Sequence, residues 1–275
     1  MTYDSASVTA AEKATAPDPA VSRMRSRTAV IVLPLVGTVV LVGAWWLIKI
    51  VTGWNEFILP SPADVVTTVV DRWDIMLSNT WITLWETVGG FLLAVVIGVP
   101  LGVALAYSWI FDRMFSPILF GFNAVPKIAV APLLVIWMGF GILPKVVMVV
   151  LLCFFPIVLS TAAGIKSTPE ELRELIRSLE ATPFQAFRKV RLPSAFPHMF
   201  VGLKLAISLA VIGAVIGEFV GATKGLGYLI VISGGTADTS LAFAALAVLA
   251  VISIALYYAL TALERWLVPW AEEQT

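Results

Sequence analysis

The chain has 275 residues, of which 59% are hydrophobic and only 13% are charged, and its mean hydropathy is +0.94. Soluble globular domains carry about a quarter charged residues, so this composition excludes an ordinary soluble protein and indicates a polytopic membrane protein. Eighteen basic and eighteen acidic residues cancel, so no net charge is available to attract nucleic acid, and we expect no such partner.

The first 27 residues mix Ala, Ser, Thr, Pro and charge without apolar periodicity, which predicts a disordered tail. Residues 29–50 then form an apolar run long enough to cross about 30 Å of hydrocarbon as an uncleaved first span. The motif Leu59-Pro-Ser-Pro62 interrupts the chain. Residues 63–73 follow it and predict a short helix outside the bilayer.

Five further spans are predicted from apolar runs of membrane-crossing length, at 77–107, 117–138, 146–165, 198–221 and 241–268. The third contains Pro126-Lys127, which predicts a helix break. Between the fifth and sixth, residues 228–232 are too few to cross as a helix. The predicted fold is therefore an all-α membrane protein with six transmembrane helices in one domain, 28–268, followed by a tail, 269–275.

The longest polar interval, residues 166–197, predicts a loop of two short helices. Thr168-Pro169-Glu170-Glu171 has the pattern of an N-cap Thr, a Pro in the first turn and a Glu at the third position. Thr182-Pro183-Phe184-Gln185 repeats this pattern. Helical spacing predicts that one face of the first helix is apolar, comprising Leu172, Leu175, Ile176 and Leu179.

The distribution of basic residues predicts the orientation. With both termini on one side, the segments on that side hold twelve of the eighteen Lys and Arg residues, the other side four, and the spans two. Since basic residues mark the cytoplasmic face, the two termini and the 166–197 loop are predicted to be cytoplasmic.

The loop also carries a recognisable motif. Glu174-Leu-Ile-Arg-Ser-Leu-Glu180, nine residues and then Val190-Arg191-Leu192-Pro193 resembles E-A-A-x3-G-x9-I-x-L-P, the loop motif of the membrane permease subunits of bacterial ABC importers. Glu180 replaces the motif's Gly, which would supply a positive φ between the two helices. Either the turn is strained at Glu180, or its left-handed residue lies elsewhere.

Three other stretches resemble the nitrate, sulfonate, taurine and thiamine-precursor branch of the same family. They are Leu59 to Val65, Val125 to Gly141, and Gly217 to Ile230. Together the resemblance covers about residues 30–268.

The resemblance implies the type I importer permease fold in the bacterial inner membrane. Two copies, or one copy and a similar partner, would form the pathway for a sulfonate, taurine, nitrate, a pyrimidine thiamine precursor or a flavin. Two ATP-binding subunits would dock on the loop and a solute-binding protein would deliver the solute. The residues expected to couple to the ATPase are Glu170, Glu171, Arg173, Glu174, Arg177, Leu179, Glu180, Thr182, Leu192 and Pro193.

This chain itself is expected to be non-catalytic and to bind no cofactor or metal. It has no G-x4-G-K-[ST] phosphate loop, so ATP and Mg²⁺ are expected on the partner ATPase. One cysteine, Cys153, and one histidine, His198, cannot form a disulfide, a histidine metal site or a catalytic set.

Ionisable side chains inside spans are costly and therefore suggest function. The candidates for the translocation pathway are Lys127, Trp137, Glu218 and Glu86. Lys127 also fits a lysine that snorkels to the interface, which is the prediction for Lys204 as well. Glu86 has no partner that the sequence identifies.

Two other classes of membrane protein are alternatives to an importer permease. An ion-gradient-driven secondary transporter is the main alternative, but it favours paired acidic residues at mid-membrane and repeated halves, and the sequence shows no clear repeat. A membrane-embedded enzyme would need a convergent set of His, Asp or Cys residues. A secondary transporter would move solute without an ATPase subunit.

Overall fold

A computed structural model describes residues 27–270, and every regular element among them is helical, as predicted. The predicted tails, 1–27 and 269–275, fall almost entirely outside the described residues. The chain divides into two compact units, residues 1–63 and 64–275.

The first unit contains α3 (Arg27–Thr52), which confirms the first apolar run as a helix. Its side chains lie largely open; Leu41 is 73% exposed and Val51 76%. Such an apolar surface suits contact with lipid. At its end the Lys49 ammonium donates to the Trp54 carbonyl (2.8 Å) and Gly53 takes φ 61°, which turns the chain out of the helix.

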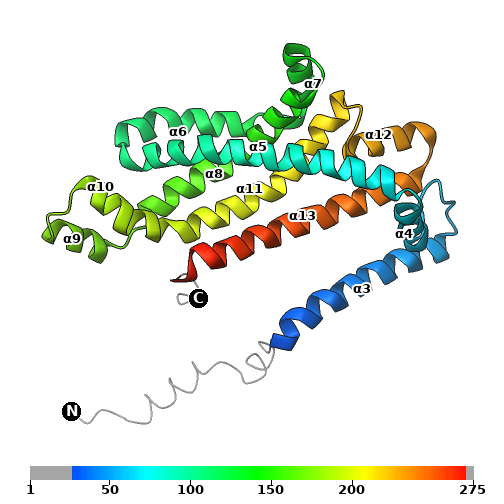
Figure 1. Cartoon of the computed structure of the whole chain (residues 1–275), viewed down its shortest axis with the longest axis horizontal. Coiled ribbons are helices and arrows are strands. Elements are labelled where there is room, and N and C mark those ends of the chain that lie inside the picture. The colour runs from blue at the N-terminus through cyan, green and yellow to red at the C-terminus, as the bar shows by residue number, and fades with distance from the viewer. Residues whose placement is uncertain (1–26, 271–275) are drawn as a thin grey trace, which may run out of the picture. The chain divides into compact units, whose positions relative to one another are not determined.

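The second unit is a bundle of long helices with shorter ones at its two ends (Figure 1). Its elements other than the loop helices are α4 (Pro62–Asp71), α5 (Trp73–Tyr107), α6 (Trp109–Ala124), α7 (Lys127–Met138), α8 (Ile142–Lys166), α11 (Leu192–Gly221), α12 (Leu226–Thr236) and α13 (Thr239–Leu267).

Helix α8 lies between α5 and α11, and the core is formed where they meet. The buried residues of this core are Phe91, Ala94, Val149, Cys153, Ile157, Ala206, Ile207, Ala210 and Ala214. Glycines allow the close approach, because a Cβ on Gly102 would lie 2.6 Å from the Thr161 Cβ and one on Gly202 would lie 2.2 Å from the Ser160 Cβ. Small residues at helix interfaces let helices approach closely in lipid, where the hydrophobic effect contributes little to helix association.

The direction of the helices follows from the same contacts. Gly90 packs against Val149 and Gly102 against Thr161, so α5 and α8 run parallel. The segment between two parallel neighbours must return the chain to the starting side, so α6 and α7 together make the third crossing. They meet at a 92° bend beside Pro126, where the sequence predicts a helix break. The third span is thus a bent pair, because Pro126 cannot continue the hydrogen-bond ladder of α6.

The remaining long helices alternate in direction. Gly217 packs against Lys145 and Gly202 against Ser160, so α11 runs antiparallel to α8. Lys204 of α11 forms an ion pair with Glu264 of α13, although the sequence predicts that Lys204 snorkels. We call the end formed by residues 107–112, 166–192 and 267–270 the loop end, and the end formed by residues 72–79, 142–145 and 218–239 the far end.

The fifth span begins earlier than its predicted start at residue 198. The helix is continuous from Pro183 to Gly221, so the second loop helix and the fifth span are one element. Pro193 follows directly after a π-helical segment, in which the Leu192 N–H donates to the Phe187 carbonyl, and Pro197 lies inside α11. At the far end, α12 has 11 residues and is too short to cross, as predicted.

Candidate functional site

The first loop helix, α9 (Glu170–Ser178), begins differently from the prediction. Its N-cap is Pro169, and the first predicted capping box is absent. The Thr168 hydroxyl instead donates to the Ile165 carbonyl (3.1 Å), so it serves the last turn of α8. The Arg173 guanidinium donates to the Glu170 carboxylate (2.8 Å) across one turn of the helix.

The turn that ends α9 has its left-handed residue at the position where the loop motif has Gly. Glu180 itself takes the left-handed conformation, with φ 47°. The Glu180 N–H donates to the Arg177 carbonyl (3.1 Å) and the Ala181 N–H to the Ile176 carbonyl (3.2 Å). This pair of hydrogen bonds is a Schellman motif, and Glu180 occupies the position where glycine is usual.

The second loop helix has the predicted capping box. The Gln185 N–H donates to the Thr182 hydroxyl (3.3 Å), and the Thr182 N–H donates to the Gln185 side chain (3.1 Å). Helix α10 (Pro183–Ala186) then leads through the π-helical η1 (Phe187–Arg191) into α11. The capping box therefore marks the start of the whole helix that ends at Gly221.

The two parts of the loop differ in how firmly the bundle holds them. Near its base, the Phe187 ring packs edge-on against Tyr107 (5.7 Å), and the Arg191 guanidinium lies over the same ring (5.1 Å). Lys166 forms an ion pair with Asp112 (2.6 Å). These contacts join η1 to the end of α5, and α8 to α6, at the loop end.

The tip of the loop is open. Most of the residues predicted to couple to the ATPase are exposed, namely Glu170, Glu171, Glu174, Arg177, Leu179, Glu180 and Thr182. Arg173, Leu192 and Pro193 are half-buried, and the Pro193 carbonyl accepts from the Trp270 indole N–H (3.3 Å). Leu179 is 69% exposed and Phe184 68%, so the tip presents apolar side chains among charged ones.

A second polar group lies buried at the far end. The Lys145 ammonium donates to Glu86 Oε1 (2.6 Å), and the Thr83 hydroxyl lies 2.6 Å from Glu218 Oε1. Glu218 Oε2 accepts the Gly227 N–H (2.5 Å). Side chains from α5, α8 and α11 thereby meet the start of α12.

The N-terminus of α12 is held by the same group. The Gly225 N–H donates to Asn79 Oδ1 (2.6 Å) and the Leu226 N–H to the Thr83 hydroxyl (2.9 Å). Gly225 has φ 119°, and a Cβ there would lie 2.2 Å from Glu218 Oε1. We call Asn79, Thr83, Glu86, Lys145 and Glu218 the far-end cluster.

Sequence reasoning identified Glu86 and Glu218 but missed that they belong together. Lys145 falls just before the predicted fourth span, 146–165, yet it lies in the first turn of α8 and is 6% exposed. The available signal was the polar stripe Asn79, Thr83, Glu86 on one face of an otherwise apolar helix.

The four pathway candidates fall in two places. Lys127 and Trp137 are on α7; the Lys127 ammonium donates to Asn123 Oδ1 (2.6 Å), and Trp137 is 70% exposed. Glu86 and Glu218 are buried inside the bundle of one chain. The role of all four in the pathway stays a prediction.

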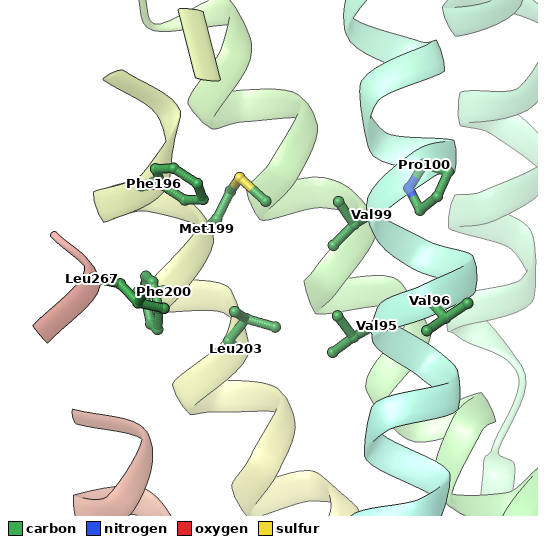
Figure 2. A pocket seen from close by; sticks show the side chains of 9 residues that line it. All are labelled: Val95, Val96, Val99, Pro100, Phe196, Met199, Phe200, Leu203 and Leu267. Carbon is green, nitrogen blue, oxygen red and sulfur yellow. The ribbon is translucent and has the colours of Figure 1, made fainter. Parts of the chain in front are cut away.

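A groove opens between α5 and α11, with one residue of α13 at its edge (Figure 2). It has a volume of about 410 Å³ and is lined by Val95, Val96, Val99, Pro100, Phe196, Met199, Phe200, Leu203 and Leu267. These side chains are all apolar, so they offer no group that would orient a charged solute.

Comparison with known proteins gives one family. Residues 98–273 match the family model described as "binding-protein-dependent transport system inner membrane component". Among solved structures, the inward-facing methionine ABC transporter MetNI contains a chain that is similar with a TM-score of 0.63 and 24% identity, over 71% of this chain and 97% of that chain. That likeness shows a shared fold.

Several curated relatives are transport permeases with named solutes. A riboflavin transport system permease of Chloroflexus aurantiacus is 40% identical, over 80% of this chain and 82% of its own length. A formylaminopyrimidine transport permease of Halalkalibacterium halodurans is 34% identical, over 80% and 88%. The taurine transport system permease of Escherichia coli is 31% identical, over 86% and 90%.

Proposed function

The chain belongs to the family of inner membrane components of binding-protein-dependent transport systems, and from this membership we propose how it works as the permease of an ATP-driven importer. The observation that carries the mechanism is the unbroken helix from Pro183 to Gly221. It joins the exposed loop at one end of the bundle to the far-end cluster at the other.

In this mechanism the loop is the contact with the ATPase. Exposed Glu174 and Arg177 set the register of docking by charge, while Leu179 and Phe184 supply apolar contact. Closure of the ATPase dimer pushes on α9 and α10. Because α10, η1 and α11 are continuous, the push tilts α11 as a rigid body, and α8, which packs along it, moves with it.

The assembly would contain more than this chain. Two ATP-binding subunits hold ATP and Mg²⁺ and carry out hydrolysis, and a second permease copy completes the pathway. A solute-binding protein delivers the solute on the opposite side. This chain contributes the pathway and the lever; it has no catalytic step of its own.

The orientation follows from the charge distribution. The loop end carries Lys166, Arg177 and Lys189 among its basic residues, with Arg113 next to it in sequence, and Arg72 and Lys224 lie toward the far end. The loop end is therefore proposed to be cytoplasmic, with both termini on that side of the inner membrane.

The solute is proposed to be a small anionic or heteroaromatic nutrient. Relatives named for riboflavin, a formylaminopyrimidine and taurine support this class. Lys127 and Trp137 on α7 are the proposed pathway residues with accessible side chains, since a cation and an indole suit an anion and an aromatic ring respectively.

The test is solute uptake into proteoliposomes that contain the chain with its ATPase. Uptake of labelled riboflavin, taurine or a pyrimidine should require the binding protein outside and ATP on the loop side. An ionophore that collapses ion gradients should leave the rate unchanged. Uptake by the chain alone, abolished by the ionophore, would instead establish the secondary transporter.

A further inference from the structure

The far-end cluster contains more buried acidic groups than basic groups. Its ionisable groups are the carboxyls of Glu86 and Glu218 and the ammonium of Lys145, which are 2%, 1% and 6% exposed. With all three ionised, the cluster would hold one uncompensated negative charge between four helices. An unpaired charge in such a site is strongly disfavoured, and a carboxyl there takes up a proton instead.

The hydrogen bonds show which carboxylate lacks a cation. The Lys145 ammonium donates to Glu86 Oε1 (2.6 Å). Glu218 is served by the Gly227 N–H (2.5 Å) and by the Thr83 hydroxyl (2.6 Å). That hydroxyl has a single hydrogen, and the Asn79 carbonyl is a second acceptor for it at 3.2 Å.

The carboxyls of Glu86 and Glu218 are neighbours in this buried cluster and interact electrostatically. Glu86 Oε2 is buried and has no donor among the described residues. Two neighbouring carboxylates repel each other unless one of them carries a proton, because an ionised carboxylate can only accept hydrogen bonds. A proton on Glu218 removes the repulsion between the two carboxylates and leaves one carboxylate to pair with Lys145.

We propose that the Glu86–Glu218 pair binds one proton, carried by Glu218, so that the closed far-end cluster is electrically neutral. The charged groups that act on Glu218 are Glu86 from α5 and Lys145 from α8. On α12 and the turn before it, Tyr228 is half-buried and Lys224 is exposed to solvent.

The two carboxyls that share the proton are on different helices, and one of these helices moves in the proposed mechanism. Glu218 is on α11, the helix that the loop drives, whereas Glu86 is on α5. Any rearrangement that separates these helices at the far end opens both carboxyls to water, where Glu218 releases its proton to the solvent; reclosure takes one up. The presence of the proton rests on burial and hydrogen bonding alone, so its test can fail without the proposed import function failing; only its release on opening rests on that function.

The test is infrared spectroscopy of the full chain in lipid nanodiscs. A protonated buried carboxyl has a C=O stretch separate from the carboxylate bands, and it shifts on exchange into D₂O. The wild type should show this band at neutral pH and Glu218→Gln should lose it. Lys145→Met should enlarge it, because a cluster without a cation holds a second proton.

Glu264→Gln is the matched control, because Glu264 is ion-paired with Lys204 elsewhere in the bundle and its loss should leave the band unchanged. A wild type without the band, or a band that survives Glu218→Gln, would overturn the proposal. Thermal unfolding gives a second readout. Glutamine mimics a protonated glutamate, so Glu218→Gln should melt within about 2 °C of wild type. A loss as large as that of Glu218→Ala would show that Glu218 is ionised.

Discussion

At the scale of single residues, two positions are constrained by their surroundings: Glu180 by its backbone conformation and Gly102 by close packing. Glu180 has φ 47° because the Schellman motif that ends α9 needs a left-handed residue at that position. An L-residue there costs roughly 1–2 kcal/mol relative to its right-handed conformation. The loop therefore stores strain at the turn between its two helices, directly beside its exposed tip.

Glu180→Gly should relieve this strain. Glycine also loses more freedom on folding, so the net gain should be several tenths of a kcal/mol to about 1 kcal/mol. Hydrogen exchange of the amides in α9 should slow by a few fold. Ser178→Gly, at a residue inside the same helix, should instead speed their exchange, and equal effects of the two variants would contradict this assignment.

Gly102 should tolerate no side chain. A Cβ there would lie 2.6 Å from the Thr161 Cβ and 2.7 Å from the Val158 carbonyl oxygen, so Gly102→Ala should force α5 and α8 apart. We expect a loss of about 1–3 kcal/mol, measured as a lower melting temperature in detergent. Gly89 in the same helix has no atom within 4 Å of its Cβ position, so Gly89→Ala is the control and should be neutral or stabilising. Equal losses would refute the tight α5–α8 contact.

At the scale of elements, the structure divides the loop into a held base and a free tip. Phe187 and Arg191 contact Tyr107, whereas Glu174 and Arg177 are exposed. In the proposed mechanism, a force applied at the tip is carried by the base into α11. The proposed docking role would account for a polar loop of two short helices on a bundle that is otherwise apolar.

Arg177→Glu and Glu174→Ala should weaken docking of the ATPase without unfolding the chain. Both side chains are exposed, so membrane insertion and melting temperature should stay as in wild type. Reversing the Arg177 charge should cost about 1–2 kcal/mol of binding, roughly tenfold in affinity. The ATPase recovered with the tagged chain and the uptake rate report the loss. Glu56→Ala, an exposed carboxylate outside the loop, is the control. Full ATPase recovery with both loop variants would argue against the docking assignment.

At the scale of the whole molecule, hydropathy predicted most of the helices, because an apolar run of about 20 residues matches the thickness of the hydrocarbon core as a helix. The break beside Pro126 was predicted from the ring alone, but its 92° angle depends on how α7 packs against α8 and α11. The early start of the fifth span was missed, because residues 166–197 form the longest polar interval and its second amphipathic helix was predicted to be separate from the span. A π-helical segment joins this helix to the fifth span, and the sequence gives no sign of such a segment.

The candidate sites were predictable to different degrees. The sequence predicted where the loop and its second capping box lie, because capping and charge are local signals, although the Thr168 hydroxyl serves the end of α8 and not the start of α9. The coupling role of the loop residues stays a prediction. The far-end cluster joins Glu86, Lys145 and Glu218 from three distant segments, and pairings of this kind depend on tertiary packing. Only the polar stripe on α5 indicated that a buried partner was needed.

The most direct test of the importer mechanism is affinity purification of this chain from detergent-solubilised native membranes, followed by mass spectrometry. The mechanism predicts a P-loop ATPase at near-equal stoichiometry, since two permease copies would meet two ATP-binding subunits. A solute-binding protein recovered with them would lead to the solute. Recovery of the chain alone, still able to transport after reconstitution, would contradict the ATP-driven mechanism.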